Sequence, residues 1–375
     1  MERISNIIHV MGSNSHNSYN TANKFYINLV LRVLFYQKLH NYSKQINFSE
    51  IIQKFSKNQS LISMEDNLHE QLFSHGYEVV KSIGKGGFAS VFLVKSHKYG
   101  VEFAAKVMKT DNASQSRLTM YKNEVELLKK LDHPNIIKIY EYFEIGTNFV
   151  IILEYCPGGT LHDEIEKRGF LPPDKFFQIA IPITNAIKFM HQNGIAHHDI
   201  KPKNILFDTY GRPKLVDFGI GVIVDDESGC DNFYCSRAYA PPEIHQKKVH
   251  NPFAADIWSL GVSFVCILSG SIPFNMESNE QLRMQIVNGL FYIDSTIPSE
   301  IRKILIGMLR VNPNMRHTIE YVEKKLNKYV NIFQKCKSCN SLVLPPLSQF
   351  QKKKAKRISS LMVIPHPKHP KMNIL

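Results

Sequence analysis

A change of periodicity at Pro157-Gly158-Gly159 divides the patterned region of the chain in two. Before it, from Tyr77 onward, short runs rich in β-branched and aromatic residues predict strands around a single helix. After it, apolar residues recur mainly at helical spacing. The pattern therefore predicts an α+β protein, with a small β-rich lobe followed by a larger α-rich lobe.

The expected elements follow directly from these two patterns. The strands expected before the glycines are Tyr77–Ile83, Val91–Val94, Phe103–Met108, Ile136–Phe143 and Phe149–Glu154, with a helix over Leu118–Leu131. The helices expected after them are Leu161–Arg168, Pro173–Asn193, Pro252–Ser269, Asn279–Asn288, Ser299–Arg310 and Ile319–Tyr329. No internal repeat interrupts this order.

The net charge of +13 suggests a nucleic-acid or membrane partner until its position in the chain is considered. Residues 1–75 carry 7 Lys and Arg against 5 acids, residues 76–330 carry 30 against 28, and residues 331–375 carry 9 and no acid. The patterned region is thus nearly neutral, and we expect no nucleic-acid partner. Six cysteines in 375 residues exclude a disulfide scaffold and indicate a reducing compartment.

Residues 1–76 are interpreted as an N-terminal extension that is mostly loosely ordered. Its one apolar run, Phe25–Tyr36, contains Asn28 and Arg32 and falls short of the roughly 20 residues that span a membrane. It also lacks the flanks of a secretory signal. Three interpretations remain open: an amphipathic helix in a loose extension, a helix that docks on the next domain or a membrane surface, or a translation start at Met64.

Residues 331–375 are interpreted as a basic, proline-containing disordered tail. The run Lys352–Arg357 precedes Ser359 and Ser360. Contact with anionic lipid or an import receptor, a pseudosubstrate or calmodulin-type segment, and a solvated tail are all open interpretations. We expect a cytoplasmic monomer, with nuclear entry through the tail as an alternative. Cys336 and Cys339 form a lone CxxC, too few ligands for a structural zinc site.

A glycine cluster at Gly84-Lys85-Gly86-Gly87 lies between two expected strands. A dinucleotide fingerprint or a Walker loop would open a helix instead. Glycines between strands suit a flap whose N–H groups cover nucleotide phosphates, although an ordinary hairpin has the same composition. Lys106 ends a small apolar strand, and Glu124 on the following helix is a candidate counter-ion.

Two further segments carry the residues that phosphoryl transfer requires. One is His197-His198-Asp199-Ile200-Lys201-Pro202-Lys203-Asn204, and the other is Asp217-Phe218-Gly219. A carboxylate orients a hydroxyl, a lysine neutralises a phosphoryl oxygen, and Asn and Asp oxygens hold Mg²⁺. The chemistry depends mainly on positioning and charge neutralisation.

These four elements, in this order and spacing, resemble the eukaryotic protein kinase domain over residues 77–330. Further matches are Leu131–Ile137 after the helix, the hinge-like Glu154-Tyr155-Cys156, Asp256–Val262, and Glu243 with Arg316. The resemblance implies a bilobal kinase fold with an N-lobe at 77–156 and a C-lobe at 157–330. The overall sequence pattern is most similar to that of the calcium/calmodulin-dependent and AMP-activated kinase (CAMK) group.

The resemblance also assigns expected roles to residues. Asp199 and Lys201 are the expected catalytic residues, and Asn204 and Asp217 the expected Mg²⁺ ligands. The expected ATP-binding residues are Ile83, Gly84, Lys85, Gly86, Gly87, Val91, Ala104, Lys106, Glu124, Leu153, Glu154, Cys156 and Leu206. Lys201, Lys203 and Ser236 favour serine or threonine as acceptor. The implied activity is transfer of the γ-phosphate of Mg-ATP to protein hydroxyls, and the alternative is a catalytically weak kinase-fold scaffold.

The chain departs from the family pattern in its activation machinery. His198 replaces the arginine that pairs with a phosphorylated activation loop, and Ser228 and Tyr234 are the only hydroxyls between Ile220 and Tyr234. We therefore expect activity that does not need phosphorylation of this loop. A cationic His198 that attracts the acids at 225–227 is one alternative, and a neutral space-filling histidine is another.

Other departures concern the glycine loop, substrate selection and the cysteines. Ala89 replaces the third loop glycine, and Pro241-Pro242-Glu243 retains the acid of the APE segment. The family positions that receive substrate arginines hold Thr160, Lys203 and Cys266, none of them acidic, so we expect weak selection of arginine. The cysteines near the expected cleft or activation segment are candidates for oxidation, with no sign of a lowered pKa: Cys156, Cys230, Cys235 and Cys266.

Overall fold

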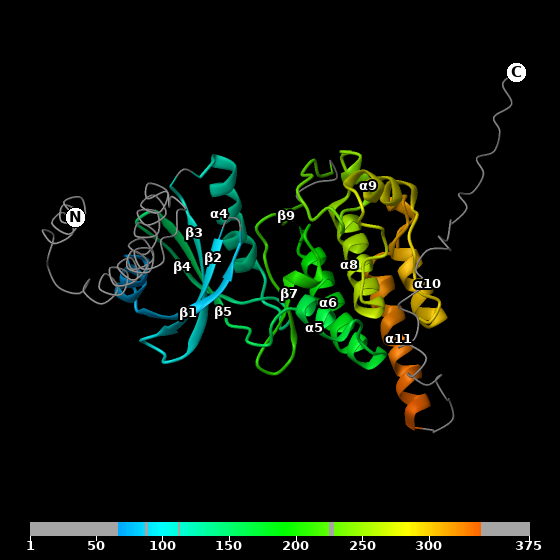
Figure 1. The fold of residues 1–375 in the computed structure, drawn as a ribbon, viewed down its shortest axis with the longest axis horizontal. Coiled ribbons are helices and arrows are strands. Elements are labelled where there is room, and N and C mark those ends of the chain that lie inside the picture. The colour runs from blue at the N-terminus through cyan, green and yellow to red at the C-terminus, as the bar shows by residue number, and fades with distance from the viewer. Residues whose placement is uncertain (1–66, 87–88, 112, 225–228, 339–375) are drawn as a thin grey trace, which may run out of the picture. The chain divides into compact units, whose positions relative to one another are not determined.

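The computed structural model describes residues 67–86, 89–111, 113–224 and 229–338, with side chains as far as residue 331 (Figure 1). The chain divides into two units, residues 1–68 and 69–375, and the fold described below is that of the second. Several features named from the sequence lie outside the described residues: Phe25–Tyr36, Met64, Gly87, the segment 225–228 and Lys352–Arg357.

The small lobe is a five-stranded antiparallel sheet in the order β1-β2-β3-β5-β4. Its strands are β1 (Tyr77–Lys85), β2 (Ala89–Ser96), β3 (Glu102–Lys109), β4 (Ile139–Ile145) and β5 (Asn148–Glu154). Helix α4 (Gln115–Lys130) packs Tyr121 and Val125 onto Met108, Phe149 and Ile151 of the sheet. The apolar residues of the helix recur at helical spacing because they form this contact.

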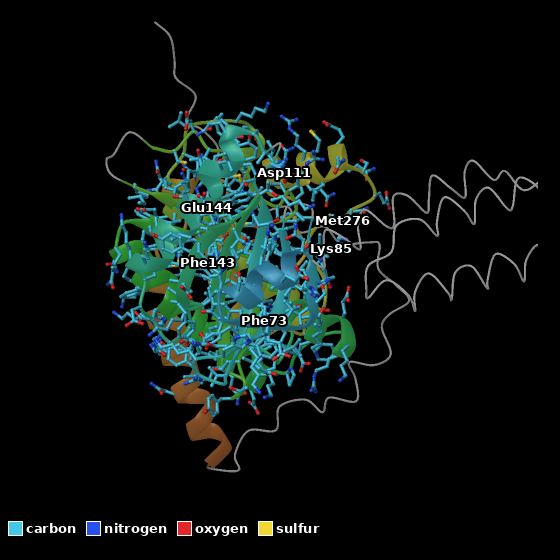
Figure 2. The ribbon with its side chains drawn as sticks, turned by 90° about the vertical axis from the view of Figure 1, so that its left-hand side faces the viewer. Phe73, Lys85, Asp111, Phe143, Glu144 and Met276 are labelled. Atoms are coloured by element: carbon cyan, nitrogen blue, oxygen red, sulfur yellow. The ribbon has the colours of Figure 1, made fainter. Side chains whose placement is uncertain are left out.

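Residues 69–74 of this unit are helical and precede the sheet. Leu72 is fully buried, Phe73 packs edge-on against His97, and the ring of His75 stacks on Phe143 of β4 at 4.8 Å. Figure 2 looks onto the face that bears Phe73 and Phe143. The helix lies inside the extension expected to be mostly loose, and it is too short to display a helical period.

The large lobe is mostly helical. Its helices are α5 (Leu161–Arg168), α6 (Pro173–Gln192), α7 (Pro242–His245), α8 (Pro252–Ser269), α9 (Asn279–Asn288), α10 (Ser299–Met308) and α11 (Ile319–Ser338), with 3-10 turns η1 (Pro202–Asn204) and η2 (Pro313–Met315). The core lies between α6 and α8, where Phe176, Trp258 and Phe264 are almost completely buried. The expected α+β arrangement of a β lobe and a helical lobe is confirmed.

Local capping explains where several helices begin. Thr160 and Asp163 form a reciprocal capping box at the start of α5, and the Asn251 side chain accepts a hydrogen bond from the Ala254 N–H at the start of α8. Helix α8 ends at Gly270, whose left-handed φ of 75° suits a glycine. These caps satisfy backbone groups that the helices leave unpaired.

Some boundaries differ from those expected. Ile136 and Ile137 do not join a strand of the small lobe, because they pair with Leu215 of the large lobe and are buried there. The strand expected to begin at Ile136 therefore begins at Ile139. Helix α11 continues to Ser338, past the boundary expected at residue 330.

Three of the four short strands of the large lobe have no sequence pattern that predicts them, whereas β8 (Pro213–Leu215) overlaps the strand-like run Lys214–Val216 before Asp217. The four strands are β6 (Ile195–Ala196) with β9 (Val222–Ile223), and β7 (Ile205–Phe207) with β8. Strands of two or three residues are too short to show an alternating pattern. They matter because they flank the segments that carry the candidate site.

Within the described part of the chain, one helix has the length and hydropathy of a membrane span. It is α8, and 83% of its apolar window is buried inside the structure. That burial identifies it as the central helix of the large lobe's core.

Candidate active site

Lys106 on β3 joins residues from both lobes. Its Nζ donates to both carboxylate oxygens of Glu124 on α4 at 2.7 Å and to Asp217 Oδ1 at 3.0 Å. Burial alone would lower the pKa of Lys106, but the two carboxylates outweigh it and raise that pKa. The ammonium therefore stays charged. The same ammonium lowers the pKa of Asp217, whose side chain remains 49% exposed.

Asp199 lies at the centre of a second group of contacts. Lys201 Nζ forms an ion pair with Asp199 Oδ2 and donates to the Ser236 hydroxyl at 2.8 Å. The Ser236 N–H donates to Asp199 Oδ1 at 3.2 Å. The Asp199 carboxylate is thus held on one side by Lys201 of the same loop and on the other by Ser236, which lies after Asp217-Phe218-Gly219 in the chain.

The amide of Asn204 has a defined orientation. Its Nδ2 donates to the backbone carbonyl of Asp199 at 2.9 Å and to Asp199 Oδ2 at 3.0 Å. Both partners are pure acceptors, so the NH₂ group must face them and Oδ1 faces the other way. This leaves an amide oxygen from Asn204 and a carboxylate from Asp217, which are the hard oxygen donors that suit Mg²⁺.

Buried Asp256 on α8 anchors the backbone of the loop that carries Asp199. Its oxygens accept the N–H of His197 at 2.8 Å and of His198 at 2.9 Å, and His191 Nε2 lies 3.0 Å away. Burial alone would raise the pKa of Asp256, but the hydrogen bond and charge of His191 lower it overall. Because His197 Nε2 donates to the Val216 carbonyl at 3.1 Å, this loop is also tied to the strand before Asp217.

The residues expected around adenine occupy adjoining strands. Ala104 pairs with Leu153, and Val91 pairs with Lys106, so β2, β3 and β5 present these side chains side by side. Leu206 on β7 pairs with Thr160 at the start of α5. The Glu154 N–H donates to the Lys138 carbonyl at 2.9 Å, so this N–H is not available to a base.

The glycine loop closes on itself. The Gly86 N–H donates to the Ala89 carbonyl at 2.8 Å, and Ile83 and Lys85 are exposed. A Cβ at Gly84 would meet Val91 at 3.6 Å, an ordinary contact. Crowding within the lobe therefore does not require a glycine at Gly84. The absence of a side chain instead lets another molecule approach this backbone.

His198 is buried and neutral. Burial lowers its pKa to about 4, so the histidine does not carry charge near neutral pH. This pKa favours the neutral space-filling alternative over the cationic one, whose acids at 225–227 lie outside the described residues. The residue also has a left-handed backbone, with φ at 66°.

The four cysteines whose side chains the structure describes do not have the low pKa of reactive thiols. Burial raises the pKa of Cys156, Cys235 and Cys266 to about 12 each, and it also raises the pKa of Cys230. Because the thiolate is the species that oxidants attack, oxidation at these positions is disfavoured. Cys266 is also too buried to receive a substrate side chain.

Several contacts of the site had no signal in the sequence. Lys214 Nζ donates to Glu154 Oε2 at 2.8 Å beneath the hinge, and the Asn123 amide of α4 donates to the Gly221 carbonyl at 2.7 Å. His250 packs beside His198 with ring centroids 5.4 Å apart. Each joins residues far apart in the chain, and no local pattern points to such a partner.

Comparison with known proteins agrees with this geometry. The protein kinase domain family matches residues 77–327. Sperm motility kinase 2B of Mus musculus is similar, with 30% identity over 257 residues that make up 68% of this chain. The match spans about half, 51%, of the length of that relative. The β-sheet lobe, the helical lobe and the family match together establish that this chain belongs to the protein kinase family.

Proposed function

We propose that the chain is a catalytically active serine/threonine protein kinase that uses Mg-ATP. The observation that carries the proposal is the complete Lys106–Glu124 pair with Asp217 in reach of the same ammonium. Kinases need both the lysine–glutamate pair and the aspartate in place for transfer. A scaffold without activity has no need of either.

The phosphates of ATP bind between the glycine loop and Lys106. Gly84 and Gly86 let the loop backbone approach the phosphates, and the lysine ammonium neutralises phosphate oxygens. Asn204 Oδ1 and the Asp217 carboxylate hold the magnesium, which supplies charge neutralisation on the phosphate chain when bound. Ala104, Val91, Leu153 and Leu206 provide the apolar surface for adenine, and the backbone of Glu154 and Cys156 supplies polar contacts.

Asp199 receives the acceptor hydroxyl and takes its proton. Lys201 lies against both Asp199 and Ser236, so its charge is available where negative charge develops on the transferring group. Asn204 donates to Asp199 and keeps the carboxylate oriented. Catalysis in this site is thus positioning and electrostatic stabilisation.

Selection of serine or threonine rests on the contact between Lys201 and the Ser236 hydroxyl at 2.8 Å. This contact holds the segment after Tyr234 close to Asp199, which favours a short acceptor side chain. The resemblance to the CAMK group, the monomeric state, the cytoplasmic location and the roles of the extension and tail stay predictions.

The test is phosphorylation of a generic protein substrate by the full chain, followed by phosphoamino-acid analysis. We expect phosphoserine and phosphothreonine, and a loss of at least about 100-fold in Asp199→Asn and Asp217→Ala. Asp132→Asn is the matched control, because that carboxylate is 96% exposed. Equal signal from wild type and Asp217→Ala would support the scaffold alternative, and a product dominated by phosphotyrosine would contradict the acceptor class.

A further inference from the structure

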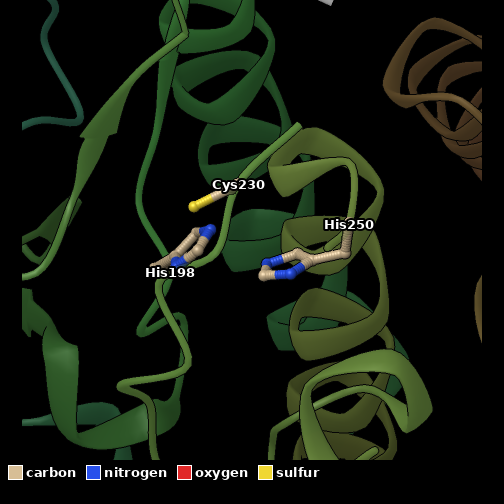
Figure 3. Close-up of side chains that lie close together, drawn as sticks. All are labelled: His198, Cys230 and His250. Carbon is tan, nitrogen blue, oxygen red and sulfur yellow. The ribbon is translucent and has the colours of Figure 1, made fainter. Parts of the chain in front are cut away.

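Three side chains with metal-binding atoms converge beside the catalytic loop (Figure 3). They are His198 of that loop, Cys230 of the segment that follows residue 228, and His250 just before α8. One ring nitrogen from each histidine and the Cys230 Sγ all lie within 4.8 Å of one another. No other such cluster occurs among the residues that the structure describes.

The backbone holds all three residues in place. Cys230 and His250 exchange two backbone hydrogen bonds, at 2.8 Å and 3.1 Å. The His198 N–H donates to Asp256 Oδ1 at 2.9 Å. The convergence therefore does not depend on mobile side chains alone.

Three of the four imidazole nitrogens in this cluster lack hydrogen-bond partners within the described part of the chain. His198 is 2% exposed and both of its ring nitrogens are unpaired, while His250 is 4% exposed and its Nε2 is unpaired. A buried polar atom without a partner is destabilising, because it has lost its hydrogen bonds to water. A cation held by one nitrogen of each ring and by the Cys230 Sγ would satisfy two of these three atoms.

The hydrogen bonds of the neighbours prepare His250 and Cys230 as ligands. His250 Nδ1 lies 3.1 Å from the Lys248 carbonyl, which can only accept, so Nδ1 carries the proton and Nε2 has a free lone pair. The Asn232 N–H donates to Cys230 Sγ at 3.4 Å, which offsets part of the burial that raises the pKa of this thiol. The His250 ring is thus in the tautomer whose Nε2 lone pair can bind a metal.

We propose that His198, Cys230 and His250 bind one zinc ion, with water as the fourth ligand. Two imidazoles and a thiolate suit Zn²⁺, whereas Mg²⁺ prefers oxygen ligands and would not compete. Tetrahedral zinc places such atoms about 3.4–3.6 Å apart, so the cluster must contract by about 1 Å through side-chain rotation. On binding, the Cys230 thiol releases its proton to solvent.

The ion would join the activation segment, through Cys230, to the catalytic loop at His198, the residue before Asp199. In the family, a phosphorylated loop and the arginine at the position of His198 make that connection. Zinc would replace it with a permanent link, which explains why the segment has so few hydroxyls. This consequence rests on the proposed kinase activity, but the metal site itself does not.

The test measures metal binding by the full chain directly. Chelator-treated protein is titrated with Co²⁺ and Zn²⁺ in excess Mg²⁺. We expect one Co²⁺ per chain and a thiolate-to-cobalt charge-transfer absorption band. Cys230→Ser should abolish the band, and His250→Gln should weaken binding by at least about 10- to 100-fold. Absence of stoichiometric binding, or a band that survives in Cys230→Ser, would overturn the proposal.

Three controls separate this outcome from other causes. Cys336→Ser with Cys339→Ser removes the lone CxxC and should leave the band unchanged; loss of the band there would assign it to the tail and overturn the proposal. Asp199→Asn should abolish phosphorylation and retain the metal, so failure of the kinase proposal remains distinguishable. A ligand variant that has lost its circular dichroism signal is unfolded and cannot be used for the titration. In that case, the wild-type chain is digested with protease with and without Zn²⁺. Zn²⁺ should slow cleavage in the segment 225–230, and no change in the cleavage rate would contradict the link.

Discussion

Arg316 and Glu243 form a buried ion pair of two parallel hydrogen bonds. Nη1 donates to Oε1 at 2.8 Å and Nη2 to Oε2 at 3.1 Å, and both residues are almost completely buried. Arg316 Nη1 also donates to the Ala254 carbonyl at 2.6 Å. The pair thereby links the Pro241-Pro242-Glu243 segment to the start of α8, and the second proline does not prevent it.

Removal of one partner of this pair should be strongly destabilising. Arg316→Ala leaves the Glu243 carboxylate buried without a counter-ion, which costs about 3–5 kcal/mol in the free energy of unfolding. Urea denaturation measures this cost. Lys303→Ala is the matched control, because the Lys303–Glu300 pair is exposed and should contribute less than about 1 kcal/mol. Similar losses in both variants would refute the distinction.

Substitutions at the Lys106–Glu124 pair should separate charge from position. Lys106→Met removes the ammonium and should lower kcat/KM for ATP by at least about 100-fold. Glu124→Gln keeps an acceptor in the same place and should cost only about 10-fold. Steady-state kinetics at varied ATP concentration test both. If kcat/KM for ATP fell equally in the two variants, positioning by Glu124 would contribute as much to activity as the charge of Lys106.

Activity should persist without phosphorylation of the activation segment. His198 is neutral and buried, so it offers no positive charge to a phosphate. Phosphatase-treated protein and the Ser228→Ala and Tyr234→Phe variants should keep activity within about twofold of the untreated wild type. Mass spectrometry confirms the phosphorylation state. Loss of nearly all activity on dephosphorylation at either hydroxyl would disprove this expectation.

Substrates should show little preference for arginine two or three residues before the acceptor. Thr160 is engaged in the cap of α5, Lys203 is positively charged, and Cys266 is buried. A carboxylate would add about 1.5–3 kcal/mol of charge-assisted hydrogen bonding, and no such group occupies these positions. A positional peptide library measures the preference. Dominance of arginine at those positions would show that acids elsewhere receive it.

Stability should decrease as the pH falls below 6.5, with His133 as one contributor. Burial and the charge of Lys214 lower its pKa, and its Nδ1 accepts the Asn135 N–H at 3.1 Å. The unfolded chain therefore binds this proton more readily, and the stabilisation present above the unfolded pKa is lost on acidification. His133→Asn keeps an acceptor without the titration. Its unfolding free energy should decline less steeply between about pH 6.5 and 5 than that of wild type; equal slopes would exclude His133.

The elements that have a distinctive local pattern could be predicted from the sequence. The strand of Lys106, the helix of Glu124 and the loop of Asp199 could be predicted because each has its own periodicity and motif. The pairing of Ile136 and Ile137 with Leu215 could not, because an apolar pair is equally suited to either lobe. His250 was also missed, since its position beside His198 arises from the tertiary fold alone.

The anchoring of the catalytic loop by Asp256 couples activity to the core. The two N–H groups before Asp199 are held by a carboxylate on α8, which is itself buried in the large lobe. A loop held by its own turns can loosen while the rest of a protein stays folded. Here separation of the loop would leave the carboxylate of Asp256, which is fully buried on α8, without the two N–H groups that it accepts. We therefore expect thermal inactivation to coincide with unfolding of this lobe.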